Sequence, residues 1–245
     1  MFVIGRREDA VKRTASEAKN GTVVPLVGDV TSKESLQKCV DAVKAQVDHV
    51  DVVIANAGTG GPRTVTKNAD GSALSFEELQ ANLWRPEMDD VTKAHHLNIT
   101  SVAYTAFAFL PLLHAANKLR EFPSNKPRPQ IIATSSVGAY NRVPLGNMSY
   151  GPSKLAVIQM MKQFSTVFVP YDIRANVIAP GYYLSDLTQA GFDKMGFLDK
   201  HNVEGTWPKK EIPLTRSGDA EDIAGVVLFL CSRAGAYTNG MVLES

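Results

Sequence analysis

Short runs of β-branched and other apolar residues alternate along this chain with longer stretches in which apolar residues recur every three or four positions. The short runs occupy residues 23–27, 50–54, 130–133 and 173–178, and they predict strands buried on one or both faces. Helical periodicity occupies residues 36–47, 157–168 and 223–230, and Thr31 and Ser32 can cap the first of these helices. Such alternation predicts a parallel sheet covered by helices.

Two stretches, residues 59–85 and 182–213, do not fit this alternation. Both are longer than ordinary connections, and long loops in compact domains are usually functional or disordered. The second stretch is rich in large apolar and aromatic side chains, among them Tyr182, Tyr183, Leu184, Phe192, Met195, Phe197, Leu198 and Trp207. A loop that faces only solvent has little reason to carry so many, so we interpret it as a lid over an apolar ligand.

Length and composition limit the class of protein. The chain has 245 residues, which suits a single domain over residues 1–245, and its 26 basic and 25 acidic side chains leave a net charge of +1. We expect neither nucleic-acid nor membrane binding, because there is no basic field and the longest apolar stretch, residues 102–113, is too short for a bilayer. The chain has two cysteines and no secretory signal, which indicates the cytoplasm.

Tyr150 and Lys154 give the first indication of chemistry. They stand four residues apart at the start of a predicted helix, and this spacing places both side chains on one face. A phenol with a pKa near 10 serves as a base at neutral pH only if its pKa falls to near 7. A cation at ~4 Å supplies ~4 kcal/mol at an effective dielectric near 20, which is enough for that change. We therefore expect Lys154 to lower the pKa of Tyr150; the alternative is an ordinary surface pair.

Small and polar residues follow the predicted strands at their carboxyl ends. Ser135 and Ser136 close the strand that begins at residue 130, where doubly wound sheets bind ligands, so a hydroxyl there can hold a substrate oxygen beside the phenol. Residues 55–58 follow another strand, and their small side chains let a ligand approach the backbone. Asp29 and Val30 end the strand before that one.

Taken together, these residues resemble the short-chain dehydrogenase/reductase family in its compact, single-domain form. The resemblance covers nearly the whole chain. It rests on six markers in the family's order: Asp29-Val30, Asn56-Ala57-Gly58, Asn98, Ser136, the pair Tyr150 and Lys154, and residues 176–181. It implies an α/β fold, a Rossmann-like doubly wound parallel sheet with helices on both faces.

The same resemblance implies a role for each catalytic candidate. Tyr150 resembles the family's proton donor or acceptor, and Lys154 resembles the group that lowers its pKa and holds the nicotinamide ribose. Ser136 is similar to the family's partner of the substrate oxygen, and we prefer it to Ser135 because Ser-Val-Gly fits the family's pattern after the strand. Asn98 resembles the residue that anchors a water linking Lys154 to bulk solvent.

A nicotinamide cofactor is implied by the resemblance as well. The residues implied to contact it are Asp29 and Val30 at the adenine, Asn56, Ala57 and Gly58 along the ribose and phosphates, Pro180, Gly181 and Tyr183 at the carboxamide, and Tyr150 and Lys154 at the nicotinamide ribose. A further strand over residues 2–4 ends in Gly5, Arg6 and Arg7, and these residues bear on the choice between NAD and NADP.

Gly5 stands where relatives that use NAD carry an acidic residue. Glycine followed by Arg6 and Arg7 removes charge repulsion and offers a guanidinium to a 2′-phosphate, so NADP is favoured over NAD, with Arg6 as the main contact. The alternative is that these arginines only begin a solvated helix. We expect no metal site, because the adjacent His95 and His96 point apart on a helix and no third ligand is spaced to join them.

Both ends of the chain depart from the family, and we expect a form truncated at both ends. The chain begins within the family's second strand, so the first strand, its glycine-rich turn and the helix after it are missing. Because the first strand is central in the family's order 3-2-1-4-5-6-7, we expect two strand edges to face each other across a gap. Residues 238–243 enter the last strand, but the acidic-glycine turn expected after it is missing.

Two functions follow from the sequence. One is an NADP-dependent oxidoreductase that transfers a hydride between nicotinamide and a ketone or secondary alcohol, with Tyr150 as general acid or base. The other is a truncated, non-catalytic relative or binding partner without cofactor binding. The aromatic lid and residues 142–145 favour a small, moderately apolar carbonyl or alcohol substrate. Residues 102–113 and 157–168 carry more apolar surface than one sheet covers, and relatives pair these helices, so we expect a homodimer or homotetramer.

Overall fold

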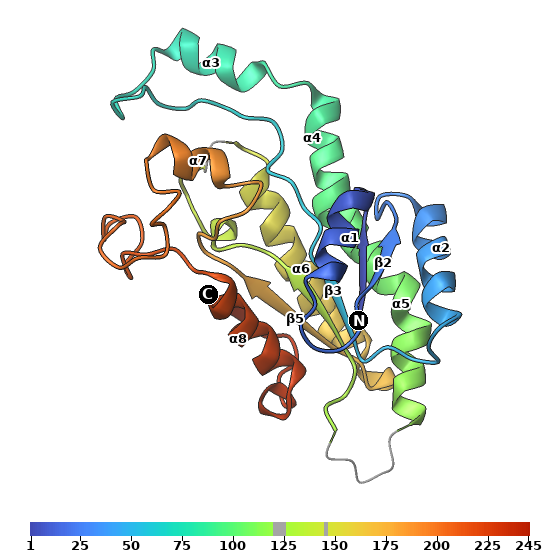
Figure 1. Ribbon diagram of the computed structural model, residues 1–245. Helices are drawn as coiled ribbons and strands as arrows, with labels where there is room; N and C mark the ends of the chain where they lie inside the picture. Colours follow the sequence, from blue (N-terminus) through green and yellow to red (C-terminus); the bar gives the residue numbers. More distant parts are fainter. Residues whose placement is uncertain (120–125, 145–146) are drawn as a thin grey trace.

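The structure is a computed structural model that describes residues 1–119, 126–144 and 147–245. Within these residues the strands form two separate sheets (Figure 1). One contains β1 (Phe2–Gly5) and β2 (Val24–Val27); the other has the order β3 (Val52–Ala55), β4 (Gln130–Thr134), β5 (Arg174–Ala179) and β6 (Val242–Glu244). Every pairing between these strands is parallel, so the fold class predicted from the sequence is confirmed.

The split into two sheets follows the expected strand order. Among the described residues, no strand pairs with the second edge of β1 or with that of β3. The family order without its first strand gives the two groups observed, β2-β1 and β3-β4-β5-β6. Ile54 of β3 lies in register with Ile132 of β4 yet is 43% exposed, whereas Ile132 is fully buried, because α8 packs over Ile132.

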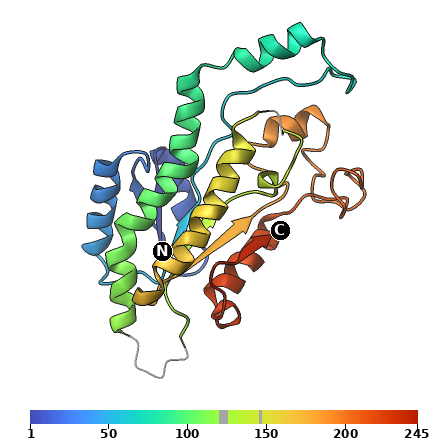
Figure 2. The ribbon, with the colours of Figure 1, turned by 180° about the vertical axis from the view of Figure 1, so that it is seen from behind.

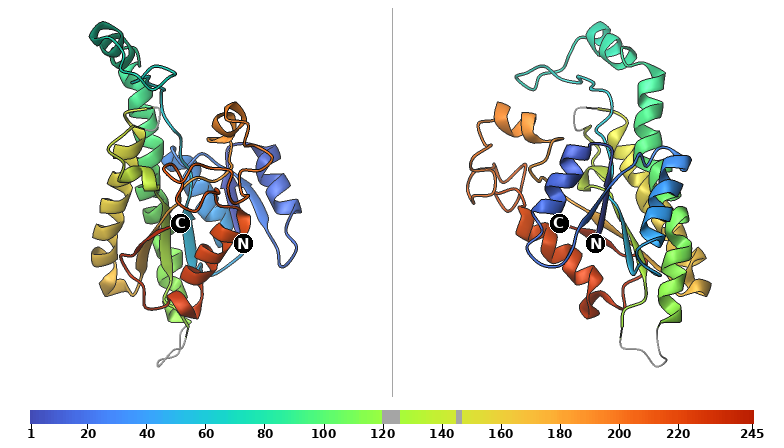
Figure 3. Two further views of the ribbon diagram at one scale, coloured as in Figure 1. Left: turned by 90° about the vertical axis from the view of Figure 1, so that its left-hand side faces the viewer. Right: turned by 45° about the vertical axis from the view of Figure 1, so that its right-hand side comes forward.

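Helices cover both faces of the larger sheet (Figure 3). On one face, α5 (Ser101–Lys118) and α6 (Tyr150–Val167) lie side by side, and α2 (Lys33–Lys44) packs against α5 (Figure 2). Their apolar stripes meet Val53, Ile131 and Val177 of the sheet in the main core. On the other face, α8 (Ala220–Cys231) packs through Leu230 on Ile132. α1 (Glu8–Ser16) packs on the two-stranded sheet.

Helix starts follow local sequence signals. Ser32 caps α2 by accepting a hydrogen bond from the Ser35 amide, as the sequence predicts. Residues 59–85, which the sequence leaves as one long connection, include the helix α3 (Phe76–Trp84). Ser75 and Glu78 form a capping box at its start. α3 buries none of its residues and projects from the body of the molecule (Figure 1).

α4 (Met88–His95), the π-helical turn η1 (His96–Thr100) and α5 form one continuous helical stretch of 31 residues. By length and composition alone this stretch could cross a membrane, with a mean hydropathy of 1.5 in its most apolar part. From the sequence, only residues 102–113 were tested for this property. One such helix is weak evidence for a membrane span, because the core helix of a soluble protein can have the same length and composition. Val102, Ala106 and Leu113 are buried against the sheet and α6, as in the core helix of a doubly wound fold.

The second long stretch, residues 182–213, has a small core of its own. It contains α7 (Gln189–Lys194), and the rings of Phe192 and Phe197 pack edge-on against Trp207 at centroid distances of 5.0 and 4.9 Å. Tyr182 lies over the same indole. Part of the apolar content of this stretch is therefore explained by internal packing, and the rest faces a cavity. Short 3₁₀ turns among the described residues are η2 (Val137–Ala139), η3 (Val169–Tyr171) and η4 (Arg233–Gly235).

Candidate active site

Tyr150 is the first residue of α6. The side-chain oxygen of Asn147, two residues before the N-cap Ser149, accepts a hydrogen bond from the Tyr150 amide at 2.7 Å and so satisfies one of the free amides at the start of the helix. Pro152 follows within the first turn, where proline is tolerated because its missing N–H has no helical partner. The phenol of Tyr150 therefore projects from a helix end that is held by a neighbouring side chain.

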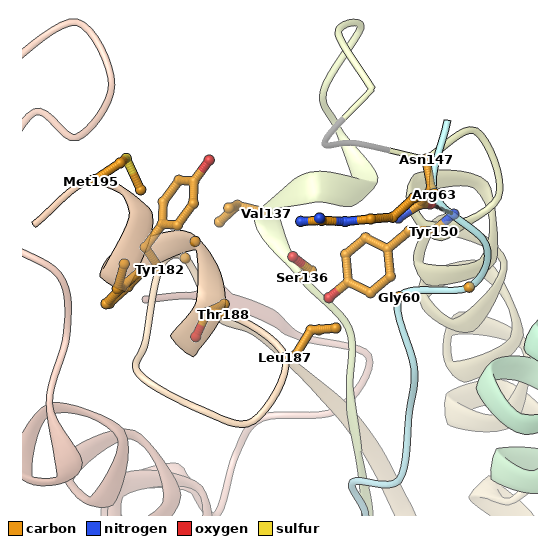
Figure 4. A pocket seen from close by; sticks show the side chains of 14 residues that line it. Gly60, Arg63, Ser136, Val137, Asn147, Tyr150, Tyr182, Leu187, Thr188 and Met195 are labelled. Carbon is orange, nitrogen blue, oxygen red and sulfur yellow. Dashed lines mark hydrogen bonds between the residues drawn. The ribbon is translucent and has the colours of Figure 1, made fainter. Parts of the chain in front are cut away.

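Two serines follow β4, and the structure gives them different roles. The Ser136 hydroxyl lies beside the Tyr150 phenol at a cavity (Figure 4) and donates a hydrogen bond to the Pro180 carbonyl at 3.4 Å. The Ser135 hydroxyl instead donates to the Lys154 carbonyl at 2.8 Å and is buried away from the cavity. Of the pair, Ser136 is therefore the one that can reach a ligand.

Lys154 lies one helical turn after Tyr150, and both side chains share one face of α6, as the spacing predicts. Its ammonium is 5.8 Å from the centroid of the Tyr150 ring and donates a hydrogen bond to the Thr134 carbonyl at 2.9 Å. The residue is 4% exposed, and burial lowers the pKa of the amine from 10.5 to about 8. The buried ammonium of Lys154 therefore lies near the Tyr150 ring and is held by a hydrogen bond at the end of β4.

The expectation that the pKa of Tyr150 falls to near 7 is wrong, because this pKa lies above its ordinary value. Burial raises the pKa of the Tyr150 phenol, and a hydrogen bond with Ser136 opposes that rise only in part. The ammonium of Lys154 points to the Thr134 carbonyl, and its charge is itself disfavoured by burial. The spacing in the sequence predicts that Tyr150 and Lys154 lie one helical turn apart. It predicts neither the burial of both side chains nor the Thr134 carbonyl that accepts a hydrogen bond from the ammonium.

Asn98 lies in η1, a π-helical turn of a kind that often marks a functional site. Its amide accepts a hydrogen bond from the Thr59 N–H at 2.8 Å, donates to the Thr59 carbonyl at 2.9 Å, and donates to the Ser153 hydroxyl. A Cβ at Gly58 would lie 3.1 Å from the Lys154 ammonium and 3.3 Å from the Asn98 oxygen. Asn98 therefore holds the segment after β3 against α6, close to Lys154.

Tyr150 and Ser136 open on a cavity of about 330 Å³ (Figure 4). Its lining consists mainly of apolar side chains and glycines, with a few polar groups among them. The lining residues are Gly60, Gly61, Arg63, Ser136, Val137, Asn147, Tyr150, Gly181, Tyr182, Leu187, Thr188, Gly191, Phe192 and Met195. A cavity of this size, apolar with convergent polar groups, is typical of a small-molecule site. Residues of the predicted lid line one side, which supports the expected contact of this stretch with an apolar ligand.

Several lining residues were missed by the sequence reasoning. Asn147 stands three positions before Tyr150, and an asparagine just before a predicted helix is a signal that could have singled it out. Arg63 and Leu187 come from the two long connections, and no linear pattern marks them. Leu145, one of the residues expected to shape the substrate site, lies outside the described residues; Val143 does not line this cavity.

The residues implied for the adenine end lie together after β1 and β2. The Asp29 carboxylate accepts hydrogen bonds from the hydroxyl and amide of Thr31 at 2.6 and 2.9 Å, which lower its pKa, and the charge of Arg6 acts in the same direction. Arg6 is exposed and forms no ion pair with a described residue. Arg7 pairs with Asp186 of the lid at 2.8 Å.

The residues implied to contact the phosphates lie at the surface, whereas of those implied for the carboxamide only part lies at the cavity. Asn56, Ala57 and Gly58 are exposed at the end of β3. Gly181 lines the cavity, and Pro180 accepts the hydrogen bond from Ser136. Tyr183 turns away: its ring covers Gly218, where a Cβ would lie 2.3 Å from the ring, and its neighbour Tyr182 lines the cavity in its place.

The sequence of this chain is similar to those of known proteins along its whole length. The sequence model of the family described as enoyl-(acyl carrier protein) reductase matches residues 2–244. The chain is 37% identical over 250 residues to the short-chain dehydrogenase/reductase PhomF of Diaporthe leptostromiformis, covering all of this chain and 80% of that protein. The chain belongs to the short-chain dehydrogenase/reductase family. It is also 35% identical to the family member SAT3 of Stachybotrys chartarum, with 99% of this chain and 90% of that protein covered.

Solved structures of short-chain dehydrogenases/reductases share the fold. The Pseudomonas aeruginosa RhlG/NADP active-site complex superposes with a TM-score of 0.76 at 24% identity, covering 99% of this chain and 83% of that one. A gluconate 5-dehydrogenase from Burkholderia cenocepacia in complex with NADP and tartrate gives 0.75 at 23% identity, covering 100% and 82%. Relatives in the family are named as dehydrogenases and reductases, so this chain is a member of an oxidoreductase family.

Proposed function

We propose that this protein is an NADP-dependent oxidoreductase that transfers a hydride between nicotinamide and a ketone or secondary alcohol, with Tyr150 as the general acid or base. The observation that carries this proposal is that Tyr150 and Ser136 line one cavity, while the buried ammonium of Lys154 lies 5.8 Å from the centroid of the Tyr150 ring. Two hydroxyls side by side can hold and protonate a single substrate oxygen, and the buried cation can stabilise the negative charge that develops on the phenol when it gives up its proton.

Each catalytic group has its own task in this mechanism. In the direction of reduction, Tyr150 donates its proton to the carbonyl oxygen, and the Ser136 hydroxyl donates a hydrogen bond to the same oxygen. Lys154 stabilises the phenolate left behind. Asn98 holds Thr59 and the wall of the site near Lys154, so it positions these groups. In oxidation the same phenolate accepts the proton of the alcohol.

The residues present fit both ends of a dinucleotide. The exposed backbone at Gly58 lies against the Lys154 ammonium without a Cβ, which leaves room for a ribose. The adenine end is framed by Asp29 and Val30. When bound, the cofactor supplies or accepts the hydride.

Gly5 and Arg6 support NADP as the preferred cofactor. A Cβ at Gly5 would lie 2.9 Å from Val11 of α1, so an acidic side chain at this position would require α1 or Val11 to move. Arg6 follows directly, is exposed, and has no carboxylate bound to it among the described residues. Gly5 therefore provides no carboxylate to accept hydrogen bonds from a ribose diol, and Arg6 provides a guanidinium that can bind a 2′-phosphate.

The same proposal includes the setting of the enzyme. A homodimer or homotetramer is supported by Tyr104 and Phe107 on α5 and Leu155 and Val167 on α6, which are exposed large apolar side chains on neighbouring helices. Cytoplasmic location stays a prediction, consistent with the free thiols of the two cysteines.

A second candidate function is a binding protein that does not hold the cofactor. The observation that favours it is the split between β1 and β3, because the dinucleotide of the first proposal would cross this split. Binding decides between the two. Fluorescence titration of the full chain with NADPH and NADH should show saturable binding with NADPH preferred; no binding of either would favour the second candidate.

Tyr150→Phe tests the proposed proton transfer. We expect kcat to fall at least 100-fold, because the phenol that exchanges the proton is lost, while the dissociation constant for NADPH stays within about twofold. Carbonyl reduction is followed by NADPH absorbance. Tyr171→Phe is the matched control, since Tyr171 is exposed and packs on His114 away from the cavity. Retention of full turnover in Tyr150→Phe would contradict the assigned role.

A further inference from the structure

The cavity beside Tyr150 has a positive charge in its wall and no negative charge to balance it. Arg63 is the charged residue among those that line it, and the remaining polar lining consists of hydroxyl and amide groups. Figure 4 shows the Arg63 side chain extending over the Tyr150 ring into the cavity, toward Ser136 and Val137. The charge therefore lies beside the space that a substrate would occupy, on a residue that is also exposed to solvent.

Arg63 has no partner for its guanidinium within the described part of the chain. The hydrogen bond recorded for this residue uses its carbonyl, which accepts from Arg85 at 3.4 Å. Seven ion pairs are present among the described residues, and none includes Arg63. A guanidinium has five donors in a planar fork that matches a carboxylate, so this side chain is free to bind one.

The loop that carries Arg63 is held in place from two sides. Asn98 binds both the amide and the carbonyl of Thr59. Gly61 has a positive φ of 73°, and a Cβ there would lie 2.7 Å from the Ser149 hydroxyl at the start of α6. Because only glycine fits this close approach, the backbone before Arg63 is fixed relative to the helix that carries Tyr150. The cation is thus presented at a defined position beside the reacting group.

Apolar side chains make up much of the remaining wall. Leu187, Phe192 and Met195 come from the lid, and Val137 follows β4. The ring of Phe192 packs against Trp207, which holds this part of the lid in place. A ligand that fits such a cavity has an apolar body and one anionic end.

We propose that Arg63 binds a carboxylate of the substrate, so that the site acts on carbonyl or alcohol compounds that carry a carboxylate beside an apolar body. This inference rests on the proposed function, since it names the substrate class of the same site. It also refines the moderately apolar substrate expected from the sequence, because that expectation included no charge. A charge-assisted, bidentate pair in a partly enclosed site favours the acid over an uncharged analogue by about tenfold or more.

The test compares 4-oxo-4-phenylbutanoate with its methyl ester, which differ in charge and share the ketone and the ring. Dissociation constants for both are measured by calorimetry with the full chain and NADP⁺ at pH 7.5, and turnover of both is measured with NADPH. We expect wild-type protein to bind the acid at least tenfold more tightly than the ester. Arg63→Gln should remove most of this preference, and Arg63→Lys should keep part of it.

The outcomes separate this inference from the proposed function. Arg13→Gln, which removes an exposed arginine at the end of α1, is the control and should keep the acid preference. Absence of an acid preference in the wild type, or its persistence in Arg63→Gln, overturns the inference even if both ketones are reduced. Weakened NADPH binding in Arg63→Gln also overturns it, because Arg63 would then serve the cofactor. If neither ketone is reduced, the proposed reaction fails for this class, while the binding ratio still tests Arg63.

Discussion

Lys154 illustrates how a functional residue acts against the stability of its own fold. Its ammonium is nearly fully buried and has the Thr134 carbonyl as its hydrogen-bond acceptor. Burial lowers the pKa of the amine from 10.5 to about 8, which corresponds to a cost of about 3 kcal/mol in the free energy of folding below pH 8. The hydrogen bond returns about 1 kcal/mol.

Lys154→Met should therefore stabilise the protein by about 2 kcal/mol at pH 7, while it abolishes turnover. Between pH 8 and pH 10.5 the unfolded chain binds more protons at this position than the folded one, so the stability of the wild type rises with pH in this window. The advantage of the variant should shrink over the same range. Urea unfolding at pH 7, 9 and 10.5 measures both effects.

Two results would count against this account of Lys154. One is a difference in unfolding free energy between wild type and variant that does not change from pH 7 to pH 10.5. The other is a variant less stable than the wild type at pH 7. Either would mean that the amine is better solvated in the native protein than its position between α6 and β4 implies.

At the scale of single residues, the sequence revealed what lies on one helix and little of what loops bring to it. Tyr150 and Lys154 could be paired because four residues make about one turn. Arg63 could not be found this way, because its place beside Tyr150 depends on the turn at Gly61 and on Asn98. The sequence also gave the wrong direction for the pKa of Tyr150, since burial cannot be read from spacing.

The start of α6 shows how an element positions a reacting group. The side-chain oxygen of Asn147 accepts a hydrogen bond from the Tyr150 amide at 2.7 Å. Asn147→Ala should lower stability by about 1 kcal/mol and also lower kcat, because the helix end that carries the phenol would fray. Asn147→Asp keeps an acceptor at the same place and should restore most of the activity. Thermal unfolding and turnover measured on the same samples test this.

Asp219→Ala is the matched control for that experiment. Asp219 caps α8, away from the Tyr150 phenol, through the amides of Glu221 and Asp222. We expect it to lower stability through the lost cap while turnover at a temperature below unfolding stays unchanged. Equal losses of turnover in the Asn147→Ala and Asp219→Ala variants would show that general destabilisation, and not the position of Tyr150, explains the effect.

Among elements, the strands and the long helices could be predicted because each has a buried, periodic face. β4 and α6 are the plainest cases, with residues 130–133 and 157–168 recognised from the sequence and confirmed in the structure. α3 was not predicted, because it buries none of its residues and so has no such face, although its capping box at Ser75 and Glu78 was readable. The aromatic content of the lid was read as ligand contact, whereas Phe197 mainly packs on Trp207.

For the whole molecule, the face formed by α5 and α6 governs the expected assembly. Phe107 is 44% exposed and lies between Tyr104 and Phe164 in an aromatic cluster. Phe107→Glu should dissociate the oligomer, because a carboxylate cannot be buried unpaired at an apolar interface. Sedimentation velocity measures the mass of wild type and variant under the same conditions.

Leu228→Glu provides the comparison for that measurement. Leu228 is 67% exposed and lies on α8, on the opposite side of the sheet from α5 and α6. This variant should sediment like the wild type. A monomeric wild type, or dissociation by Leu228→Glu instead, would show that α5 and α6 do not form the interface.

The strand order of the whole molecule could be predicted only from the family resemblance, because runs of apolar residues predict strands but not which strands are neighbours.

The ion pair between Arg7 and Asp186 joins the turn after β1 to the lid, two segments 179 residues apart in the chain. Both side chains are largely exposed, at 69% and 80%, and water and salt weaken such a contact to a small fraction of what a buried pair provides. We therefore expect concentrated salt to weaken the attachment of the lid to the turn after β1, while the buried contacts of Phe192 and Trp207 within the lid stay unchanged.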